Sequence, residues 1–114
     1  MPYINARVSE KVSAEAAERI KTQLGKAIEA IPGKSENWLM VEICPECDLW
    51  FRGDNSEATA YVEVKIFGRA ASSACEKLTG LICGIFESEL SISPERTYVK
   101  YEFCDTWGWN NANF

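Results

Sequence analysis

Hydrophobic and polar residues alternate along three stretches of the chain, with the two-residue period of a half-buried β-strand. The alternation covers residues 3–8, 58–67 and 97–104. A shorter apolar stretch, residues 38–43, predicts a further strand. The core-facing positions of these strands are expected to be Ile4, Ala6, Val8, Leu39, Val41, Ile43, Ala60, Val62, Val64, Ile66, Val99, Tyr101 and Phe103.

Two other stretches have the three-to-four-residue period of an amphipathic helix. The first follows Ser13, a residue type that caps helices, and continues to Ile31, after which Pro32-Gly33 ends it. The second begins at Ser73-Ala74-Cys75-Glu76, which fits a capping box, and ends near Leu90. Both helices are long enough to connect parallel strands, so each half of the chain predicts a β-α-β unit.

The resulting order, βαββαβ, predicts an α+β fold formed by residues 1–114 as a single domain. We expect one four-stranded mixed sheet with both helices on one face. The other face would carry charged and aromatic side chains together: Tyr3, Asn5, Arg7, Trp38, Met40, Glu42, Tyr61, Glu63, Lys65, Tyr98, Lys100 and Glu102. This mixture predicts an oligomer that closes around a partly wet centre, with exposure on a two-layer monomer as the alternative.

The chain is acidic, with a net charge of −5, and its Lys and Arg residues are scattered. A general nucleic-acid-binding role is therefore not expected. No apolar run approaches about 18 residues and the N-terminus does not read as a signal peptide, so we expect no membrane partner. Five cysteines without a signal peptide suggest reduced thiols. We therefore expect a cytoplasmic protein, with secretion by a non-classical route as the alternative.

Histidine is absent from the chain. Its absence excludes Ser-His and Cys-His nucleophilic machinery and every metal site with a His ligand. Acid–base chemistry near neutral pH then needs another group. The α-amino group is one of the few that remain, with a reference pKa of about 7.7–8.0.

Cys44-Pro45-Glu46-Cys47 forms a CxxC motif. A redox motif of the thioredoxin type opens a helix, whereas this motif leaves a strand and enters a turn. A zinc site would need two further ligands, and we expect no metal. Disulfide formation and metal binding are the alternatives to an ordinary pair of thiols.

Several short segments, taken in order, resemble the macrophage migration inhibitory factor and D-dopachrome tautomerase family. They are Met1-Pro2 opening into a strand, Gly33-Lys34, Asn55-Ser56-Glu57, Phe67-Gly68, Ile92–Val99, and Gly108-Trp109-Asn110-Asn111 closed by Phe114. The resemblance covers essentially the whole chain. It implies a homotrimer in which three sheets form an inner barrel with active sites between subunits. It also implies keto–enol interconversion of α-keto acids such as phenylpyruvate, without a metal or organic cofactor.

The resemblance also implies roles for individual residues. Removal of Met1 would make Pro2 the amino-terminal catalytic base, and an apolar pocket with a nearby cation would keep its amine neutral. Lys34 would bind the substrate carboxylate, and the backbone of Phe67 would contact the substrate. Aromatic side chains are expected to line the pocket: Tyr3, Trp38, Trp107, Trp109 and Phe114.

Tyr98 and Lys100 are two residues apart, so they project from the same strand face. In the family this face reaches the active site of the neighbouring subunit. Tyr98 matches the expected tyrosine, whereas Lys100 departs from the asparagine of familiar members. Lys100 would either meet a second carboxylate or a phenol on the substrate, or pair with Glu102 or Glu63 without a catalytic role.

Two other functions remain open at this point. One is a signalling or host-interaction protein that keeps the fold with weak or vestigial activity. The other is a related reaction such as muconate isomerisation or dehalogenation, for which Arg69 and Glu102 are the candidate partners. The CxxC of vertebrate family members matches Thr59 and Val62 here, so redox activity attributed to that motif is not carried over.

Overall fold

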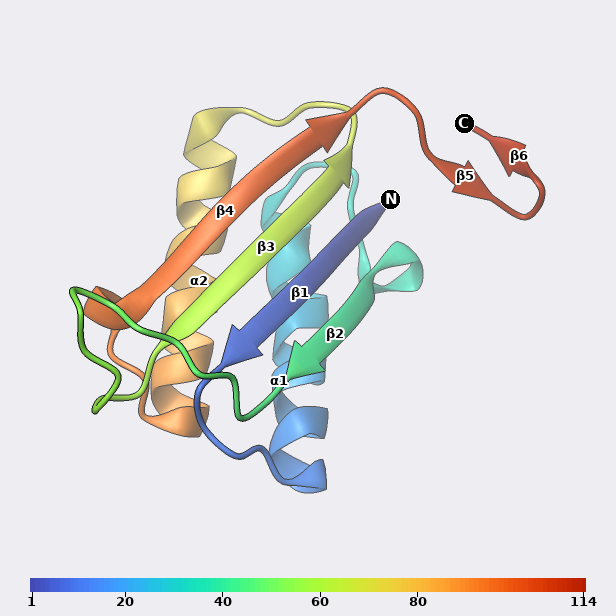
Figure 1. Cartoon of the computed structure of the whole chain (residues 1–114). Coiled ribbons are helices and arrows are strands. Elements are labelled where there is room, and N and C mark those ends of the chain that lie inside the picture. Colours follow the sequence, from blue (N-terminus) through green and yellow to red (C-terminus); the bar gives the residue numbers. More distant parts are fainter.

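Four strands form one sheet, and two helices cover one of its faces (Figure 1). The structure, a computed structural model, describes residues 1–114. The strands are β1 (Pro2–Val8), β2 (Met40–Cys44), β3 (Ala60–Phe67) and β4 (Thr97–Cys104). The helices are α1 (Ala14–Ala27) and α2 (Ser72–Leu90).

The strand order is β2-β1-β3-β4. Helix α1 connects β1 to its parallel neighbour β2, and α2 connects β3 to its parallel neighbour β4. The two β-α-β units meet at the centre of the sheet, where β1 and β3 pair antiparallel from Pro2↔Ile66 to Val8↔Ala60. The predicted α+β fold with a mixed four-stranded sheet is therefore confirmed.

The core lies between the sheet and the two helices. It consists mainly of aliphatic side chains from β1, β3 and the inner faces of the helices, with Phe86 as its largest fully buried side chain. Each fully buried Ile, Leu or Phe contributes about 1.5–3 kcal/mol relative to an exposed one. The predicted core faces of β2 and β4 also pack against this cluster, although they are only partly buried.

Three predicted boundaries are wrong, each for a local reason. The α-helical turns of α1 end at Ala27, and a 3₁₀ turn carries the chain to Ala30. Trp38 lies in the 3₁₀ helix η2 (Glu36–Trp38), because the backbone N–H of Leu39 donates to the Glu36 carbonyl and delays the strand. Helix α2 begins before Ser73, because the Ala71 carbonyl accepts the first helical hydrogen bonds and no side chain caps the helix.

The C-terminal tail forms a small hairpin that sequence periodicity did not predict. Strands β5 (Gly108–Trp109) and β6 (Ala112–Asn113) pair antiparallel and project beyond the sheet (Figure 1). Asn110 and Asn111 connect them with φ angles of 53° and 67°. Two consecutive left-handed residues define the turn type that matches the twist of a two-residue hairpin, and asparagine tolerates this conformation.

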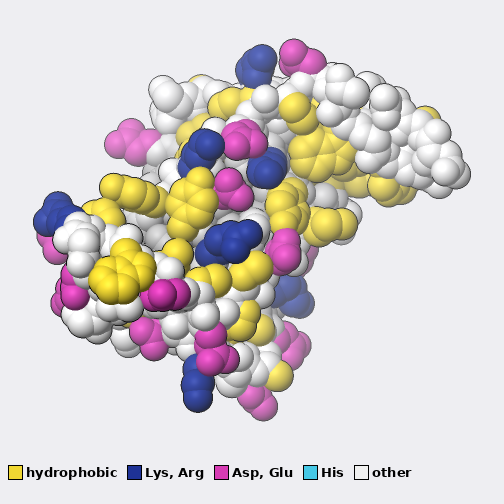
Figure 2. Space-filling view, in the orientation of Figure 1, with side chains coloured by type: hydrophobic (Ala, Val, Ile, Leu, Met, Phe, Trp, Pro, Cys, Tyr) yellow, Lys and Arg dark blue, Asp and Glu magenta, His cyan; other side chains and the backbone are white.

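The sheet face opposite the helices carries no covering element. Figure 2 views this open face, where dark blue, magenta and yellow side chains intermingle over the strands. Tyr61 and Tyr98 lie opposite each other in the register of β3 and β4, next to the pair Glu63 and Lys100, so charged and aromatic residues are mixed there as predicted. Lys100 Nζ lies 3.3 Å from Glu102 Oε1, and Lys65 Nζ lies 4.0 Å from Glu102 Oε2. Neither α1 nor α2 is long and apolar enough to cross a membrane.

Replacement of Ser13 by Ala is expected to destabilise the protein by about 1 kcal/mol, a typical cost of losing an N-cap. The Ser13 hydroxyl accepts a hydrogen bond from the Ala16 amide at 3.1 Å and so caps α1. The control is Ser73→Ala, because Ser73 lies inside α2 and caps nothing. Chemical denaturation measures both variants, and equal losses of stability would contradict the assignment of the cap.

Glu89→Gln is expected to lower the unfolding temperature at neutral pH. The Glu89 carboxylate accepts hydrogen bonds from Arg19 at 2.8 Å and from Gln23 at 2.9 Å, which connects α2 to α1. These bonds hold the pKa of Glu89 below its ordinary 4.5. The stabilisation is therefore present above pH 4.5 and is lost as the pH falls through the lowered folded-state pKa.

Thermal unfolding of the parent and of Glu89→Gln should differ at neutral pH and converge in acid. Glu76→Gln, an exposed position on the same helix, serves as the control and should track the parent throughout. A difference for Glu89→Gln that stays constant down to about pH 3 would show that ionisation of this carboxyl does not stabilise the fold.

Candidate active site

A cavity of about 650 Å³ opens at the end of the sheet where β1 begins. Three segments far apart in the sequence line it: residues 1–3, residues 37–40 and residues 107–109. Pairing of Pro2 with Ile66 and of Ile66 with Phe103 places the start of β1 beside the ends of β3 and β4. The fold therefore gathers the N-terminus, the 3₁₀ helix η2 and the C-terminal hairpin around one hollow.

Aromatic rings form one side of this region. Trp38 and Trp109 meet edge to face, with ring centroids 5.1 Å apart. Phe114 stacks on Trp109 at 6.3 Å and also lies 5.8 Å from Phe67. Trp109 and Phe114 remain more than half exposed, and Phe114 lies with Trp109 against an adjacent hollow of about 170 Å³ rather than in the cavity itself. Such rings offer a planar apolar surface to an aryl group.

Lys34 brings a positive charge to the same end of the sheet. Its Nζ donates to the Phe67 carbonyl at 3.0 Å, and it forms no ion pair with any carboxylate. The left-handed Gly33, with a φ of 81°, forms the turn after α1 that delivers Lys34 to this position. A partly buried cation without an acidic partner is suited to binding an anionic ligand.

The amino terminus lies beside Lys34. Burial and the Lys34 charge lower the pKa of the Met1 amine below its ordinary value of 8.0. The Met1 carbonyl accepts a hydrogen bond from the Phe67 amide at 3.0 Å. The surroundings of the N-terminus therefore favour a neutral amine. The Met1 carbonyl also engages the Phe67 amide, which would otherwise be free to donate to another group.

Tyr3 also lines the cavity, but its hydroxyl donates to the Glu42 carboxylate on β2. This hydrogen bond is the main reason that the pKa of Tyr3 rises to about 12. The phenol therefore stays protonated and engaged with Glu42. Tyr3 contributes a ring to the cavity wall rather than an acid or a base.

Tyr98 and Lys100 do not reach the cavity of their own chain. Tyr98 pairs with Tyr61, five residues along β3 from Ile66, so about 17 Å of strand separates it from Pro2. Lys100 lies opposite Glu63 and pairs with Glu102. The hydrogen bond to Glu102 raises the pKa of Lys100. Of the two interpretations of Lys100, the ion pair is the one present in the single chain.

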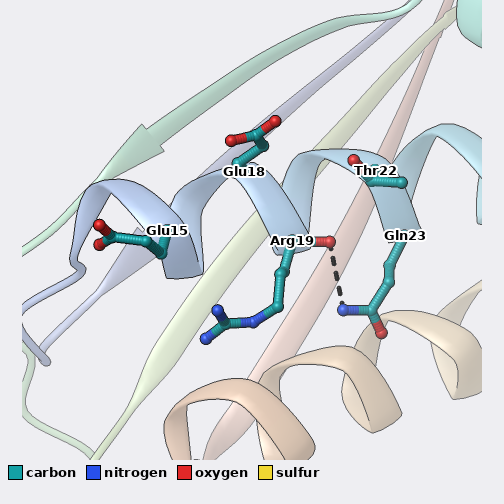
Figure 3. Close-up of a pocket in the computed structure, with 5 residues that line it drawn as sticks. All are labelled: Glu15, Glu18, Arg19, Thr22 and Gln23. Atoms are coloured by element: carbon teal, nitrogen blue, oxygen red, sulfur yellow. Dashed lines mark hydrogen bonds between the residues drawn. The ribbon is translucent and has the colours of Figure 1, made fainter.

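The remaining candidates, which are the CxxC cysteines, Arg69 and a second cavity on α1, do not form a second reactive site. Cys44 and Cys47 belong to no group of three side chains that could hold a metal ion. Burial raises the pKa of the Cys44 thiol, which makes it a poor nucleophile. Arg69 pairs with Asp105 at 3.7 Å on the exposed surface. A cavity of about 420 Å³ on α1 is lined only by polar side chains of that helix, and Gln23 bonds back to the Arg19 carbonyl (Figure 3).

Five cavity residues were not expected from the sequence: Met1 as part of the wall, Asn37, Leu39, Met40 and Gly108. Leu39 was assigned to the core and Met40 to the open face. The proximity of residues 37, 39 and 40 to Trp38 in the sequence could have indicated that they line the cavity, because η2 brings the whole segment there.

Comparison with known proteins identifies the family. The sequence model of the macrophage migration inhibitory factor (MIF) family matches residues 1–113. The mouse macrophage migration inhibitory factor is 25% identical over 103 residues, which cover 89% of each chain. The crystal structure of Leishmania major MIF2 is 28% identical, with a TM-score of 0.93 over 100% of this chain and 97% of that chain. A homologue from Prochlorococcus marinus is 30% identical, with a TM-score of 0.82 over 98% of both chains.

The similarity therefore extends over both β-α-β units and the C-terminal hairpin. It includes the first residues of β1 and the segment that contains Lys34, which together form the candidate site. The chain belongs to the macrophage migration inhibitory factor family.

Proposed function

We propose that this protein is a keto–enol tautomerase that acts on phenylpyruvate-like α-keto acids without a cofactor. The observation that carries the proposal is the meeting of three features at one end of the sheet. They are an N-terminus whose pKa is lowered, the unpaired cation of Lys34, and an aromatic cavity. Membership of the MIF family supports the same conclusion.

Pro2 is the proposed general base. Removal of Met1 would turn its nitrogen into a secondary amine in the surroundings that lower the pKa of the Met1 amine. Burial and the Lys34 charge would act on Pro2 in the same direction, leaving a neutral amine near pH 7. A base of this kind is matched to proton abstraction from the carbon beside a keto group.

The proposed reaction moves one proton and leaves the composition of the substrate unchanged. Pro2 takes a proton from the carbon next to the keto group, and the electron pair of that C–H bond forms the C=C bond of the enol. The keto oxygen gains negative charge and then a proton, from the Pro2 ammonium or from water. Lys34 stabilises the charge as it develops. Ketonisation follows the same steps in reverse.

Substrate binding would use the groups around Pro2. Lys34 would hold the carboxylate, because a charge-assisted hydrogen bond to a partly buried cation is strong. Loss of Met1 would also free the Phe67 amide, which now donates to the Met1 carbonyl, for a substrate oxygen. The aryl group would lie against Trp38, Trp109 and Phe114.

We further propose a homotrimer with active sites between subunits. The open face of the sheet, with its exposed aromatic residues and charged pairs, is the surface that would turn inward. Tyr98 and Lys100 lie too far from Pro2 of their own chain to act with it, so a neighbouring copy is the one they could serve. At that site Lys100 would have to release Glu102 to meet a second anionic group on a substrate.

A second candidate function is signalling with weak or vestigial activity. Family membership favours it, because the mouse and rat relatives are named for inhibition of macrophage migration. A chain that keeps Met1 would have the surface of the family without its proposed base. A biological effect that persists in Pro2→Gly would support this function.

Pro2→Gly is expected to lower the rate of phenylpyruvate enol ketonisation by about 10²- to 10⁴-fold, the usual contribution of a positioned acid or base. Enol absorbance measures the rate, and intact mass confirms that Met1 is absent from both proteins. An unchanged rate in the variant would exclude Pro2 as the base. No rate above background in a processed parent protein would overturn the proposed activity.

Lys34→Gln is expected to raise KM by about 10- to 100-fold, because the substrate carboxylate loses a charge-assisted hydrogen bond. It should also move the acidic limb of the pH–rate profile to higher pH, since the Lys34 charge lowers the pKa of the terminal amine. The control is Lys77→Gln on the exposed surface of α2. A pH profile that shifts to lower pH, or does not shift, would contradict this role.

A further inference from the structure

The loop between β2 and β3 contains a tight turn that begins at Phe51. Phe51 and Asp54 exchange two backbone hydrogen bonds, of 2.9 and 3.0 Å. Between them Arg52 and Gly53 have φ angles of 54° and 75°. Two consecutive left-handed residues make this a hairpin turn of the same type as the C-terminal one. The ring of Phe51 is therefore held on a rigid tip rather than on a loose loop.

Arg96 fastens this turn to the start of β4. Its side chain is only 10% exposed. The guanidinium donates to the Asp54 carbonyl at 2.8 Å and to Thr59 Oγ1 at 3.0 Å. It also lies 3.7 Å from a carboxylate oxygen of Glu57 and 5.4 Å from the centre of the Phe51 ring. These bonds use the fixed fork of an arginine, and a lysine has no equivalent geometry.

Phe51 in turn supports Tyr98. The two rings meet edge to face, with centroids 5.4 Å apart and planes at 88°. Tyr98 is 62% exposed, and its hydroxyl has no hydrogen-bond partner among residues 1–114. An exposed tyrosine has little reason to keep one ring position unless a neighbour fixes it. Tyr61 is its register partner on β3, but the ring of Phe51 is the only aromatic ring that packs edge to face on the Tyr98 ring.

We propose that Arg96 and Phe51 are positioning residues that fix the Tyr98 ring as a preformed wall for the aryl end of a substrate in the neighbouring copy. The inference rests on the proposed function, because Tyr98 cannot reach Pro2 of its own chain. A fixed ring loses little freedom when a ligand binds, so the arrangement favours affinity for an aryl group. Arg96 and Phe51 touch neither Pro2 nor the cavity, and they act through Tyr98 alone.

The test compares Phe51→Leu, Arg96→Lys and Tyr98→Ala with the parent enzyme, all without Met1. Phe51→Leu and Arg96→Lys should each raise KM for phenylpyruvate by about 3- to 10-fold and leave kcat within about twofold, since an aromatic contact is lost but the base is intact. In the Tyr98→Ala background, Phe51→Leu should change KM no further. Trp50→Leu, an exposed position on the same loop, is the control and should match the parent.

A second measurement follows the ring itself by NMR with labelled tyrosine, without any substrate. The Tyr98 ring should become more mobile in Phe51→Leu and in Arg96→Lys, but not in Trp50→Leu. Unchanged ring mobility would overturn the inference, as would a KM effect of Phe51→Leu that persists in Tyr98→Ala. If Pro2-dependent activity is present and these variants match the parent, the inference fails and the proposed function stands. If the parent has no Pro2-dependent activity, both the proposed function and the substrate role of Tyr98 fail.

Discussion

The antiparallel pairing of β1 with β3 is the constraint on which the candidate site depends. The first strand of the chain is a central strand, held on one side by β2 and on the other by β3. Ends of chains usually fray, but here Pro2 is buried and Phe67 bonds to the residue before it. Pairing of Pro2 with Ile66 does not involve Met1, so it would also fix the nitrogen of the proposed base relative to Lys34 after removal of Met1.

The same pairing divides the polar and apolar sides of the molecule. Register from Pro2↔Ile66 onward places Ile4, Ala6 and Val8 with the alternate residues of β3 against the helices. The intervening residues of all four strands then face away from the helices. Glu63 lies opposite Lys100, and Lys65 lies opposite Glu102, so unlike charges meet across β3 and β4. Because the charges on this sheet face are already largely paired with one another, a second charged face can approach it closely.

The fold was predictable where one signal dominated. Strict alternation identified β1, β3 and β4, and Ser13 followed by an apolar helical period identified the start of α1. The prediction that Ser73 caps α2 was wrong. Two adjacent serines offered alternative caps, but the helix begins after Ala71 and neither serine side chain caps it. The hairpin after Trp107 escaped prediction because two residues per strand are too few to show a period, although Asn110-Asn111 indicated the turn.

The candidate site depended more on resemblance than on pattern. Nothing in the spacing of Pro2, Lys34 and Phe67 indicates that they meet, because their contact follows from the order of strands in the sheet. The bond between Tyr3 and Glu42 is a diagonal contact between neighbouring strands, which alternation alone does not specify. Likewise, the clamp of Arg96 on Asp54 joins residues 42 positions apart through a loop without periodicity.

The hydrogen bond from the Phe67 amide to the Met1 carbonyl has a consequence for the proposed removal of Met1. An aminopeptidase must draw the Met1–Pro2 bond into its own cleft, which is incompatible with a Met1 carbonyl bonded to β3. Ile66, the partner of Pro2, is translated roughly 3–13 s later at typical rates of about 5–20 residues per second. The nascent N-terminus is therefore unpaired for seconds before its strand closes. Under the proposed removal of Met1, the peptidase and β3 would compete for the Met1 carbonyl, and the long sequence separation between β1 and β3 would leave time for removal before the strands pair.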